Sequence, residues 1–276
     1  MLVAGAIWLS DGGGDGGPTA VDPNPDAVTD VGSGDEGGAS QGNLLDAFLS
    51  YAGELDLDTG EFEQCLGDQG RAEVIGNHLQ QGDELGVTGT PTFFINNKKI
   101  VGAQPTEIFL EIIEQEREGS PTSTDAYSEA IQQLAGTSPP RFEIVDTVPD
   151  VSNAPIEGNP DAGVMIAEFS DFQCPFCQRW TQQSMDAIRA ELGEDVALAF
   201  MHFPLTQLHP NAGNASYAAV CAGEQDAFWE MHDLLFARQS QWADLRRSMT
   251  AAESPEAPGA RRRDAVLAAR SALRCL

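Results

Sequence analysis

The stretch FQCPFCQRW, residues 172–180, decides how the rest of this 276-residue sequence is interpreted. It places two cysteines three positions apart, directly after the apolar run VMIAEFSD at residues 164–171. The apolar run predicts a strand over 164–169, and the segment that follows the cysteines predicts a helix over 178–192. Cys174 and Cys177 therefore mark the passage from strand to helix. At that place the free N–H groups and the dipole of the helix would stabilise a thiolate.

The C-x-x-C spacing is compatible with a reactive dithiol, with half of a zinc site or with an inert disulfide. A second pair of zinc ligands is missing, because the other cysteines and the histidines lack the spacing of a metal site: Cys65, Cys221, Cys275, His78, His202, His209 and His232. An inert disulfide would close so short a loop that it would contribute little stability. The pattern therefore favours redox chemistry, and no metal or organic cofactor is expected.

The order of residues within the pair assigns different roles to the two sulfurs. Cys174, at the first helical turn, is the predicted attacking thiolate, and Cys177, one turn further on, is the predicted resolving thiol. Pro175 suits an opening turn, where no backbone N–H is needed. A reduced form stabilised as a thiolate would make the disulfide a comparatively strong oxidant.

The charge balance is strongly acidic, with 43 acidic and 15 basic residues and a formal net charge of −28. This excludes a nucleic-acid partner, which would need the opposite sign. A solvated surface suited to concentrated salt is the favoured interpretation, and an acidic face that docks a cationic partner is the alternative.

Composition divides the chain into five segments. Residues 1–43 combine a short apolar stub with a Gly- and Asp-rich stretch, which predicts a flexible tether and suggests a domain held near a membrane. Two blocks with helix and strand patterns follow at 44–118 and 142–245, joined by a linker at 119–141. Residues 246–276 hold seven arginines and predict a disordered tail or a reading-frame artefact, with a basic docking arm as the alternative.

The second block resembles the first half of the DsbA family of thiol-disulfide oxidoreductases, which have a thioredoxin fold with an inserted helical domain. The resemblance rests on FSDFQCPFCQ at 169–178, FMHFPLTQLHPNA at 200–212 and CAGEQDAFWEMHDLLFARQ at 221–239. In that family the remaining helices, a cis-proline loop, a hairpin and a closing helix come next. After residue 245 this sequence has none of them.

The missing parts are found earlier in the chain. LLDAFLSYAGELDLDTGEFEQCLG at 44–67 resembles the end of the helical insertion, ELGVTGTPTFF at 84–94 the cis-proline loop, and INNKKIVGAQPTEIFLEIIEQ at 95–115 the hairpin and final helix. The resemblance therefore predicts an α/β, thioredoxin-like fold assembled from exchanged halves. One chain could close on itself as a permuted domain, or two chains could exchange halves as a dimer.

The resemblance also assigns roles to residues outside the cysteine pair. It implies that Pro91, after Thr90, is cis and faces the dithiol, where the backbone can pair with an extended substrate. Phe172 and Phe176 are expected, together with Pro175 and Thr90, to form the substrate-binding surface. Cys65 and Cys221 fall in the two halves of the helical insertion, which suggests a structural disulfide, with two buried free thiols as the alternative.

These observations together predict a protein thiol-disulfide oxidoreductase that oxidises protein thiols outside the cytoplasm. Its expected partners are protein thiols and a redox partner that the sequence does not name, a membrane protein being one candidate. A non-catalytic peptide-binding module, a truncated remnant and a thioredoxin-type reductase are the alternatives.

Overall fold

The structure is a computed structural model that describes residues 43–245. The predicted tether before residue 43 and the Arg-rich tail at 246–276, with Cys275, lie outside these residues. No helix within residues 43–245 is long and apolar enough to cross a membrane.

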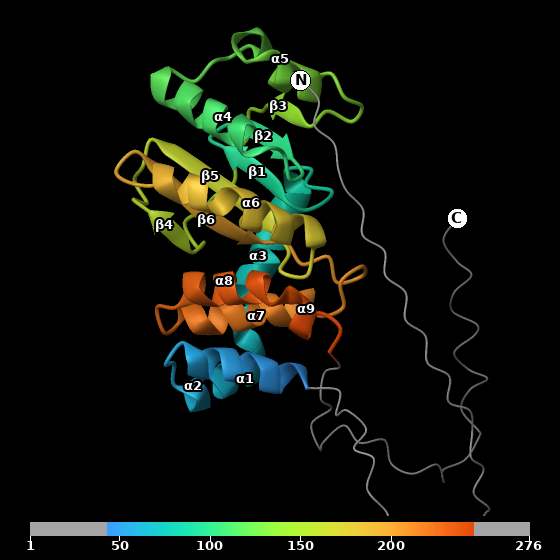
Figure 1. Ribbon diagram of the computed structural model, residues 1–276, viewed down its shortest axis with the longest axis vertical. Coiled ribbons are helices and arrows are strands. Elements are labelled where there is room, and N and C mark those ends of the chain that lie inside the picture. The colour runs from blue at the N-terminus through green and yellow to red at the C-terminus, as the bar shows by residue number, and fades with distance from the viewer. Residues whose placement is uncertain (1–42, 246–276) are drawn as a thin grey trace, which may run out of the picture. The chain divides into compact units, whose positions relative to one another are not determined.

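A mixed six-stranded sheet forms the centre of the described part, in the order β3-β2-β1-β5-β6-β4 (Figure 1). Neighbours β5 and β6 are parallel, whereas all other neighbouring strands are antiparallel. The strands are β1 (Thr92–Ile95), β2 (Lys98–Val101), β3 (Phe142–Ile144), β4 (Ile156–Gly158), β5 (Val164–Ser170) and β6 (Val196–His202). The sheet and its helices confirm the predicted thioredoxin-like α/β class.

The pairing of β1 with β5 joins the two sequence blocks. Thr92 lies opposite Phe169, and Phe93 lies opposite Glu168. Residues 44–118 and 142–245 therefore contribute neighbouring strands to one sheet, although a long stretch of chain separates them. The strand β5, the helix α6 (Pro175–Glu191) and the strand β6 follow one another as a parallel crossover unit.

Helices cover both faces of the sheet, and the alternation of side chains along β5 shows how. Val164 and Ile166 point to the core beneath α4 (Thr106–Glu118) and α6 (Pro175–Glu191). Ala167 and Phe169 point to the opposite face, where α3 (Glu73–Glu84) packs. Near its end α3 comes so close to the sheet that a Cβ atom on Gly82 would lie 2.4 Å from Cε2 of Phe203.

A helical region lies against one end of the sheet (Figure 1). Its helices are α1 (Leu44–Glu54), α2 (Thr59–Gly67), α7 (Ala212–Gly223), α8 (Phe228–Ala237) and α9 (Gln239–Trp242), with a 3-10 turn at Gln69–Ala72. Asn43 and Asp58 begin α1 and α2 by accepting backbone N–H groups of the first turns. Because α1 and α2 precede the sheet and α7 to α9 follow it, both blocks build this region too.

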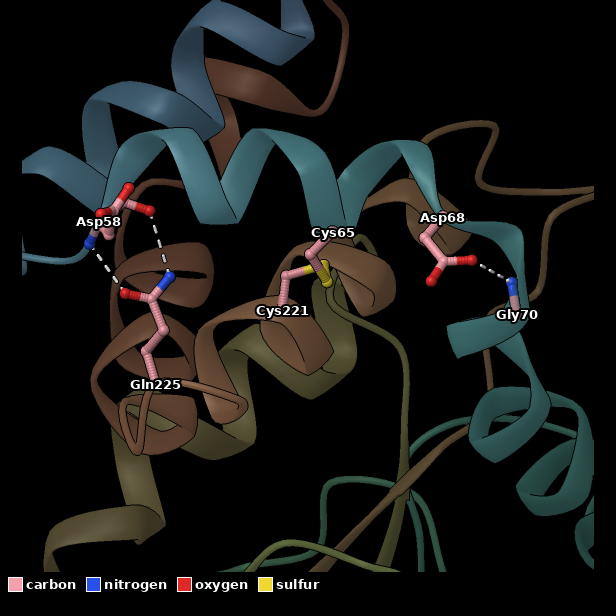
Figure 2. The surroundings of a disulfide bond; sticks show 6 residues. All are labelled: Asp58, Cys65, Asp68, Gly70, Cys221 and Gln225. Atoms are coloured by element: carbon pink, nitrogen blue, oxygen red, sulfur yellow. Dashed lines mark hydrogen bonds between the residues drawn. A yellow bond between two sulfur atoms is a disulfide. The ribbon is translucent and has the colours of Figure 1, made fainter.

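A disulfide between Cys65 and Cys221 links α2 to α7 (Figure 2). Close by, Asp58 donates its N–H to Gln225 Oε1 at 2.8 Å, and Gln225 Nε2 donates to the Asp58 carbonyl at 3.2 Å. The two halves of the helical region are thus joined by a covalent bond and by a pair of hydrogen bonds.

The segment at 119–141, which the sequence predicts to be a linker, is folded. It contains a 3-10 turn at Thr124–Ala126 and the helix α5 (Glu129–Ala135). Tyr127 and Ile131 are buried in the core beneath α4. The mostly polar composition of the segment gives little sign of these two buried residues. Because they are buried, the connection packs on the sheet instead of spanning open solvent.

Both lysines of the chain are buried in β2. Lys98 forms an ion pair with Glu116 at 2.8 Å. Lys99 donates to the carbonyls of Leu85 at 3.0 Å and Gly86 at 2.8 Å. These carbonyls lie at the C-terminal end of α3, where the helix has no further N–H groups to donate to them. By donating to both, Lys99 caps α3 and links it to the sheet just before the proline loop.

Candidate active site

The two cysteines of the CPFC stretch lie at the start of α6. Cys174 is the residue before the first helical turn, and Pro175 occupies that first position. Both cysteines are free thiols; Cys174 is 3% exposed and Cys177 is fully buried. The structure therefore presents the reduced state of a dithiol, with one sulfur at the rim and one beneath it.

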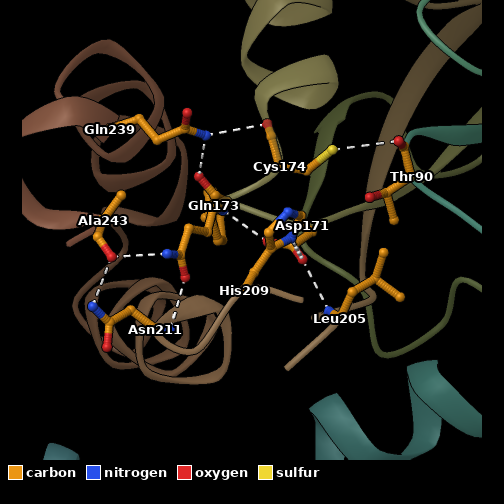
Figure 3. A network of polar contacts seen from close by, with 10 residues as sticks. Thr90, Asp171, Gln173, Cys174, Leu205, His209, Asn211, Gln239 and Ala243 are labelled. Carbon is orange, nitrogen blue, oxygen red and sulfur yellow. Dashed lines mark hydrogen bonds and ion pairs between the residues drawn. The ribbon is translucent and has the colours of Figure 1, made fainter. Parts of the chain in front are cut away.

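A loop from the other block lies directly beside Cys174. The Thr90–Pro91 peptide bond is cis, and β1 begins at the next residue. Cys174 Sγ lies 3.4 Å from the carbonyl oxygen of Thr90 (Figure 3). Residues 84 positions apart in the chain thus meet at the sulfur.

The surroundings shift the pKa values of the two thiols in opposite directions. The hydrogen bond from the Cys177 thiol lowers the pKa of Cys174 to about 6, and Thr90 and the N–H groups of Cys177 and Phe176 add to this effect while burial opposes it. Burial raises the pKa of Cys177 well above its usual value, and the neighbouring Cys174 and Glu168 reinforce the shift. Near neutral pH the site holds one thiolate and one thiol, which is the arrangement needed for attack by Cys174.

Glu168 is a carboxyl group on β5 in the interior behind Cys177. Its side chain is completely buried, and neither carboxyl oxygen has a hydrogen-bond partner among the described residues. Burial raises its pKa to about 8, so the carboxyl group carries a proton at neutral pH. In the sequence, the one sign of a special role for Glu168 is that an acidic residue stands inside the apolar run VMIAEFS.

The aromatic residues around the dithiol divide into one exposed and two buried side chains. Phe176 is 53% exposed, and the Arg179 guanidinium lies 5.0 Å from the centre of its ring. Phe172 is fully buried and stacks on Phe200 at 4.8 Å. Its predicted place on a substrate-binding surface is therefore corrected to a place in the core, because the helical region covers it. Trp180 is likewise buried.

Three of the four histidines lie in the interior. His78, His202 and His232 are each at most 1% exposed, and the rings of His78 and His202 stack at 5.7 Å. Burial lowers the pKa of all three, of His78 to about 4. Within residues 43–245 no group of three or more histidine, cysteine or acidic side chains is arranged to hold a metal ion.

A dithiol at a helix N-terminus, facing a cis-proline loop on a mixed sheet, is an arrangement consistent with the thioredoxin-like fold. Comparison with known families agrees with this class. Residues 40–114 match the DSBA-like thioredoxin domain, and residues 151–274 match a thioredoxin family, a match that extends into the Arg-rich tail. These two matches support a DsbA-like thioredoxin-fold family for this chain.

Similar segments occur in proteins of quite different length. The chain is 41% identical over 99 residues to Na(+)/H(+) antiporter NhaA 1 of Mycolicibacterium gilvum, covering 35% of this chain and 16% of that protein. It is 43% identical over 96 residues to Na(+)/H(+) antiporter NhaA 3 of Salinispora tropica, covering 33% and 14%. It is 33% identical over 86 residues to probable disulfide bond formation protein D of Bacillus anthracis, covering 30% and 40%. The match thus spans less than a fifth of these antiporters and two fifths of the Bacillus protein.

Proposed function

We propose that this protein is a thiol-disulfide oxidoreductase that oxidises protein thiols through Cys174 and Cys177. The observation that carries the proposal is the position of Cys174 Sγ, 3.4 Å from the Thr90 carbonyl and at the first turn of α6. The low pKa of Cys174, about 6, means that its thiolate is stabilised, and this stabilisation favours the reduced form of the pair. A stabilised reduced form makes the disulfide a stronger oxidant, which favours oxidation of substrates over their reduction.

The reaction begins with the oxidised pair. A substrate thiolate attacks Cys174 Sγ, the bond between the two enzyme sulfurs breaks, and Cys177 leaves with the electron pair. The proposed source of the proton that Cys177 then takes up is Glu168, which is protonated at neutral pH and influences the pKa of Cys177. A second substrate thiolate attacks the substrate sulfur of the mixed disulfide, so the substrate becomes a disulfide and Cys174 is released as a thiolate. Exchange with an oxidised partner restores the pair.

The substrate is proposed to bind across the rim formed by Thr90, Pro91, Pro175 and Phe176. The half-exposed Phe176 ring offers an apolar contact beside the sulfur. The cis bond at Pro91 presents the backbone of Thr90 toward the sulfur, where an extended peptide can pair with it.

The location is proposed to be outside the cytoplasm and close to a membrane. The Cys65–Cys221 disulfide supports an oxidising compartment, since such bonds are rare in the cytosol. The occurrence of similar segments in chains named as Na(+)/H(+) antiporters supports a setting next to a membrane, and makes a membrane protein a candidate redox partner.

We also propose that residues 44–118 and 142–245 form one working unit within a single chain. The support is the shared sheet and the close approach of Thr90 to Cys174. The alternative is that two chains exchange these halves. A truncated remnant is disfavoured by the same contacts, since together the halves complete the site.

The test of the function uses a reduced, unfolded protein with several thiols as substrate. The parent protein is expected to accelerate disulfide formation in this substrate, and Cys174→Ser is expected to abolish the acceleration because the attacked sulfur is gone. With glutathione disulfide present as the oxidant, the Cys174 thiolate of Cys177→Ser should displace a glutathione thiolate and accumulate as a mixed disulfide, which mass spectrometry can identify, because Cys177 is no longer there to resolve it. If Cys174→Ser behaves like the parent, the protein is a peptide-binding module and not an enzyme.

The reductase alternative is separated by the reduction potential of the pair, measured against a glutathione buffer. An oxidase should have a potential well above that of thioredoxin, which is about −270 mV. A value near that figure would assign the site to reduction instead.

A further inference from the structure

The turn that leads into the CPFC site is built by Asp171. This residue is fully buried three positions before Cys174. Its Oδ1 accepts the N–H of Gln173 at 2.7 Å, and its backbone carbonyl accepts the N–H of Cys174 at 3.0 Å. Both bonds bend the chain between β5 and α6. Asp171 therefore determines where the helix begins and where Cys174 lies at its N-terminus.

The second carboxyl oxygen of Asp171 is held by the segment between β6 and α7. Oδ2 accepts the N–H of Leu205 at 2.9 Å and the Nδ1–H of His209 at 2.7 Å (Figure 3). The His209 side chain is 19% exposed, whereas that of Asp171 is inaccessible. Because a buried carboxylate needs polar partners, His209 is the side chain that keeps Asp171 in this position.

The residues after Asp171 are fastened by two further side chains. Gln239 Nε2 donates to the carbonyls of Phe172 at 2.8 Å and Cys174 at 3.1 Å. The side chain of Gln173 accepts the N–H of Asn211 at 2.7 Å. Gln239 and Gln173 thus hold the residues after Asp171, and the contact with His209 holds Asp171 itself (Figure 3).

We propose that His209 is a positioning residue for the reaction, acting through Asp171 to hold the Cys174 sulfur at the start of α6 and beside Thr90. This inference rests on the proposed function of the dithiol. His209 itself touches neither cysteine in any described contact, so its role is to hold the turn by donating a hydrogen bond to the buried side chain of Asp171. Without this bond the turn loosens, and the Cys174 sulfur is held less closely to the N–H groups at the start of α6. This change disfavours the thiolate.

The experiment compares two substitutions at one position in the full-length, reduced protein. In His209→Asn the side-chain amide can replace Nδ1 as donor to Asp171, whereas His209→Leu removes the donor at similar size. The rate of alkylation of Cys174 by iodoacetamide is measured from pH 4 to 10, and peptide mass spectrometry separates Cys174 from Cys177 and Cys275.

We expect the midpoint of the Cys174 profile to stay near that of the parent in His209→Asn and to rise by about one unit or more in His209→Leu. A rise of one unit lowers the thiolate fraction, and with it the rate below the midpoint, about tenfold. Should His209→Leu fail to fold, His209→Ala takes its place with the same expectation. Arg117→Gln is the control, since it removes ion pairs with Glu191 at the end of α6 and with Asp195 in the loop after it, without touching the turn.

An unchanged midpoint in the folded His209→Leu protein would overturn the inference, as would an equal shift in Arg117→Gln, which would point to general loss of stability. The proposed function fails separately. A parent protein that does not oxidise substrate, but whose Cys174 profile depends on His209, would refute only the oxidase proposal.

Discussion

Glu168 is the residue at which burial and ionisation conflict most clearly. Burial raises its pKa from 4.5 to about 8, since the charged form would have no partner in the interior. A carboxyl group that is costly to ionise would not persist for packing alone, because an apolar side chain would fill the same space. Glu168 helps to raise the pKa of Cys177, and its proposed use is as a proton donor and acceptor for this thiol, which solvent does not reach.

Replacing Glu168 by Gln should change how stability depends on pH. Between pH 4.5 and 8 the folded parent keeps a proton that the unfolded chain loses, so its free energy of unfolding falls as pH rises through this range. Glu168→Gln removes this loss, and its advantage over the parent should grow by at most about 1.4 kcal/mol per pH unit. Urea unfolding at pH 5 and pH 8.5 measures the difference.

The exposed Glu194→Gln serves as control, and its difference from the parent should not vary with pH in this way. Parallel curves for Glu168→Gln and the parent would mean that Glu168 ionises in the folded protein much as it does in the unfolded chain. The parent curve itself also contains the buried histidines. Their lowered pKa values act in the opposite direction, with stability lost as pH falls from 6.5 toward 4, so only the comparison between variants isolates Glu168.

At the scale of elements, α3 carries the proline loop and joins the helical region to the sheet. Two of its glycines differ in their surroundings. A Cβ atom on Gly82 would lie 2.4 Å from the ring of Phe203 and 3.2 Å from that of Phe169, whereas a Cβ atom on Gly76 would meet nothing within 4 Å. The absence of a side chain at residue 82 therefore sets how closely α3 approaches β6.

Gly82→Ala is expected to destabilise the protein by about 1 to 3 kcal/mol, because the methyl group must displace buried rings. Gly76→Ala in the same helix should stabilise it, by up to about 1 kcal/mol, because alanine favours the helical conformation. Thermal unfolding of both variants provides the measurement. Equal effects of the two substitutions would show that the close contact at residue 82 relaxes at no cost.

Elements with a strong local pattern were predictable from sequence, whereas two very short strands were not. The apolar run predicted a strand at 164–169, and the structure has β5 at Val164–Ser170. The hairpin that the resemblance implies within 95–115 is present, with a positive φ of 48° at Asn96 in its turn. The strands β3 and β4 escaped notice because three residues are too few to show alternation.

In the site, features that depend on neighbouring residues were predictable from sequence, whereas features that depend on residues far along the chain were not. Local sequence predicts the cysteine pair at a helix start, because the strand, Pro175 and the helix pattern adjoin one another. The buried position of Phe172 depends on α8, which covers it from far along the chain. Asp171 and His209 could not be paired from sequence, since 38 residues separate them and nothing in their spacing indicates contact.

At the scale of the whole molecule, the Cys65–Cys221 bond spans 156 positions and joins the first block to the second. Whether these cysteines pair could not be settled from sequence, because the answer depends on how the two blocks meet. In the folded chain α2 and α7 lie side by side, and the bond closes between them.

The double substitution Cys65→Ala and Cys221→Ala should lower the free energy of unfolding by about 2 to 5 kcal/mol, because a long loop is released in the unfolded state. Denaturant unfolding of the variant and the parent measures this loss. The Cys174→Ser protein is the control, since it lacks a thiol without losing this bond. A loss no larger than in the control would mean that contacts between α2 and α7 suffice alone.

The same bond reports whether one chain or two complete the fold. If a single chain supplies both halves, the parent should run as a monomer on a non-reducing gel, with the cross-linked 65–221 peptide present in its digest. A covalent dimer that persists after Cys275→Ser and collapses to monomer on reduction would instead show that two chains exchange their halves.

The burial of Lys98 and Lys99 has a practical consequence for anyone who handles this protein. Apart from the amino terminus, no other primary amine exists in the chain, and the two that do are engaged in the interior by Glu116 and by the end of α3. Succinimidyl esters, aldehyde fixatives and lysine-specific proteases should therefore leave the folded domain untouched. Reaction of Lys98 or Lys99 with any of these reagents would indicate that β2 has opened.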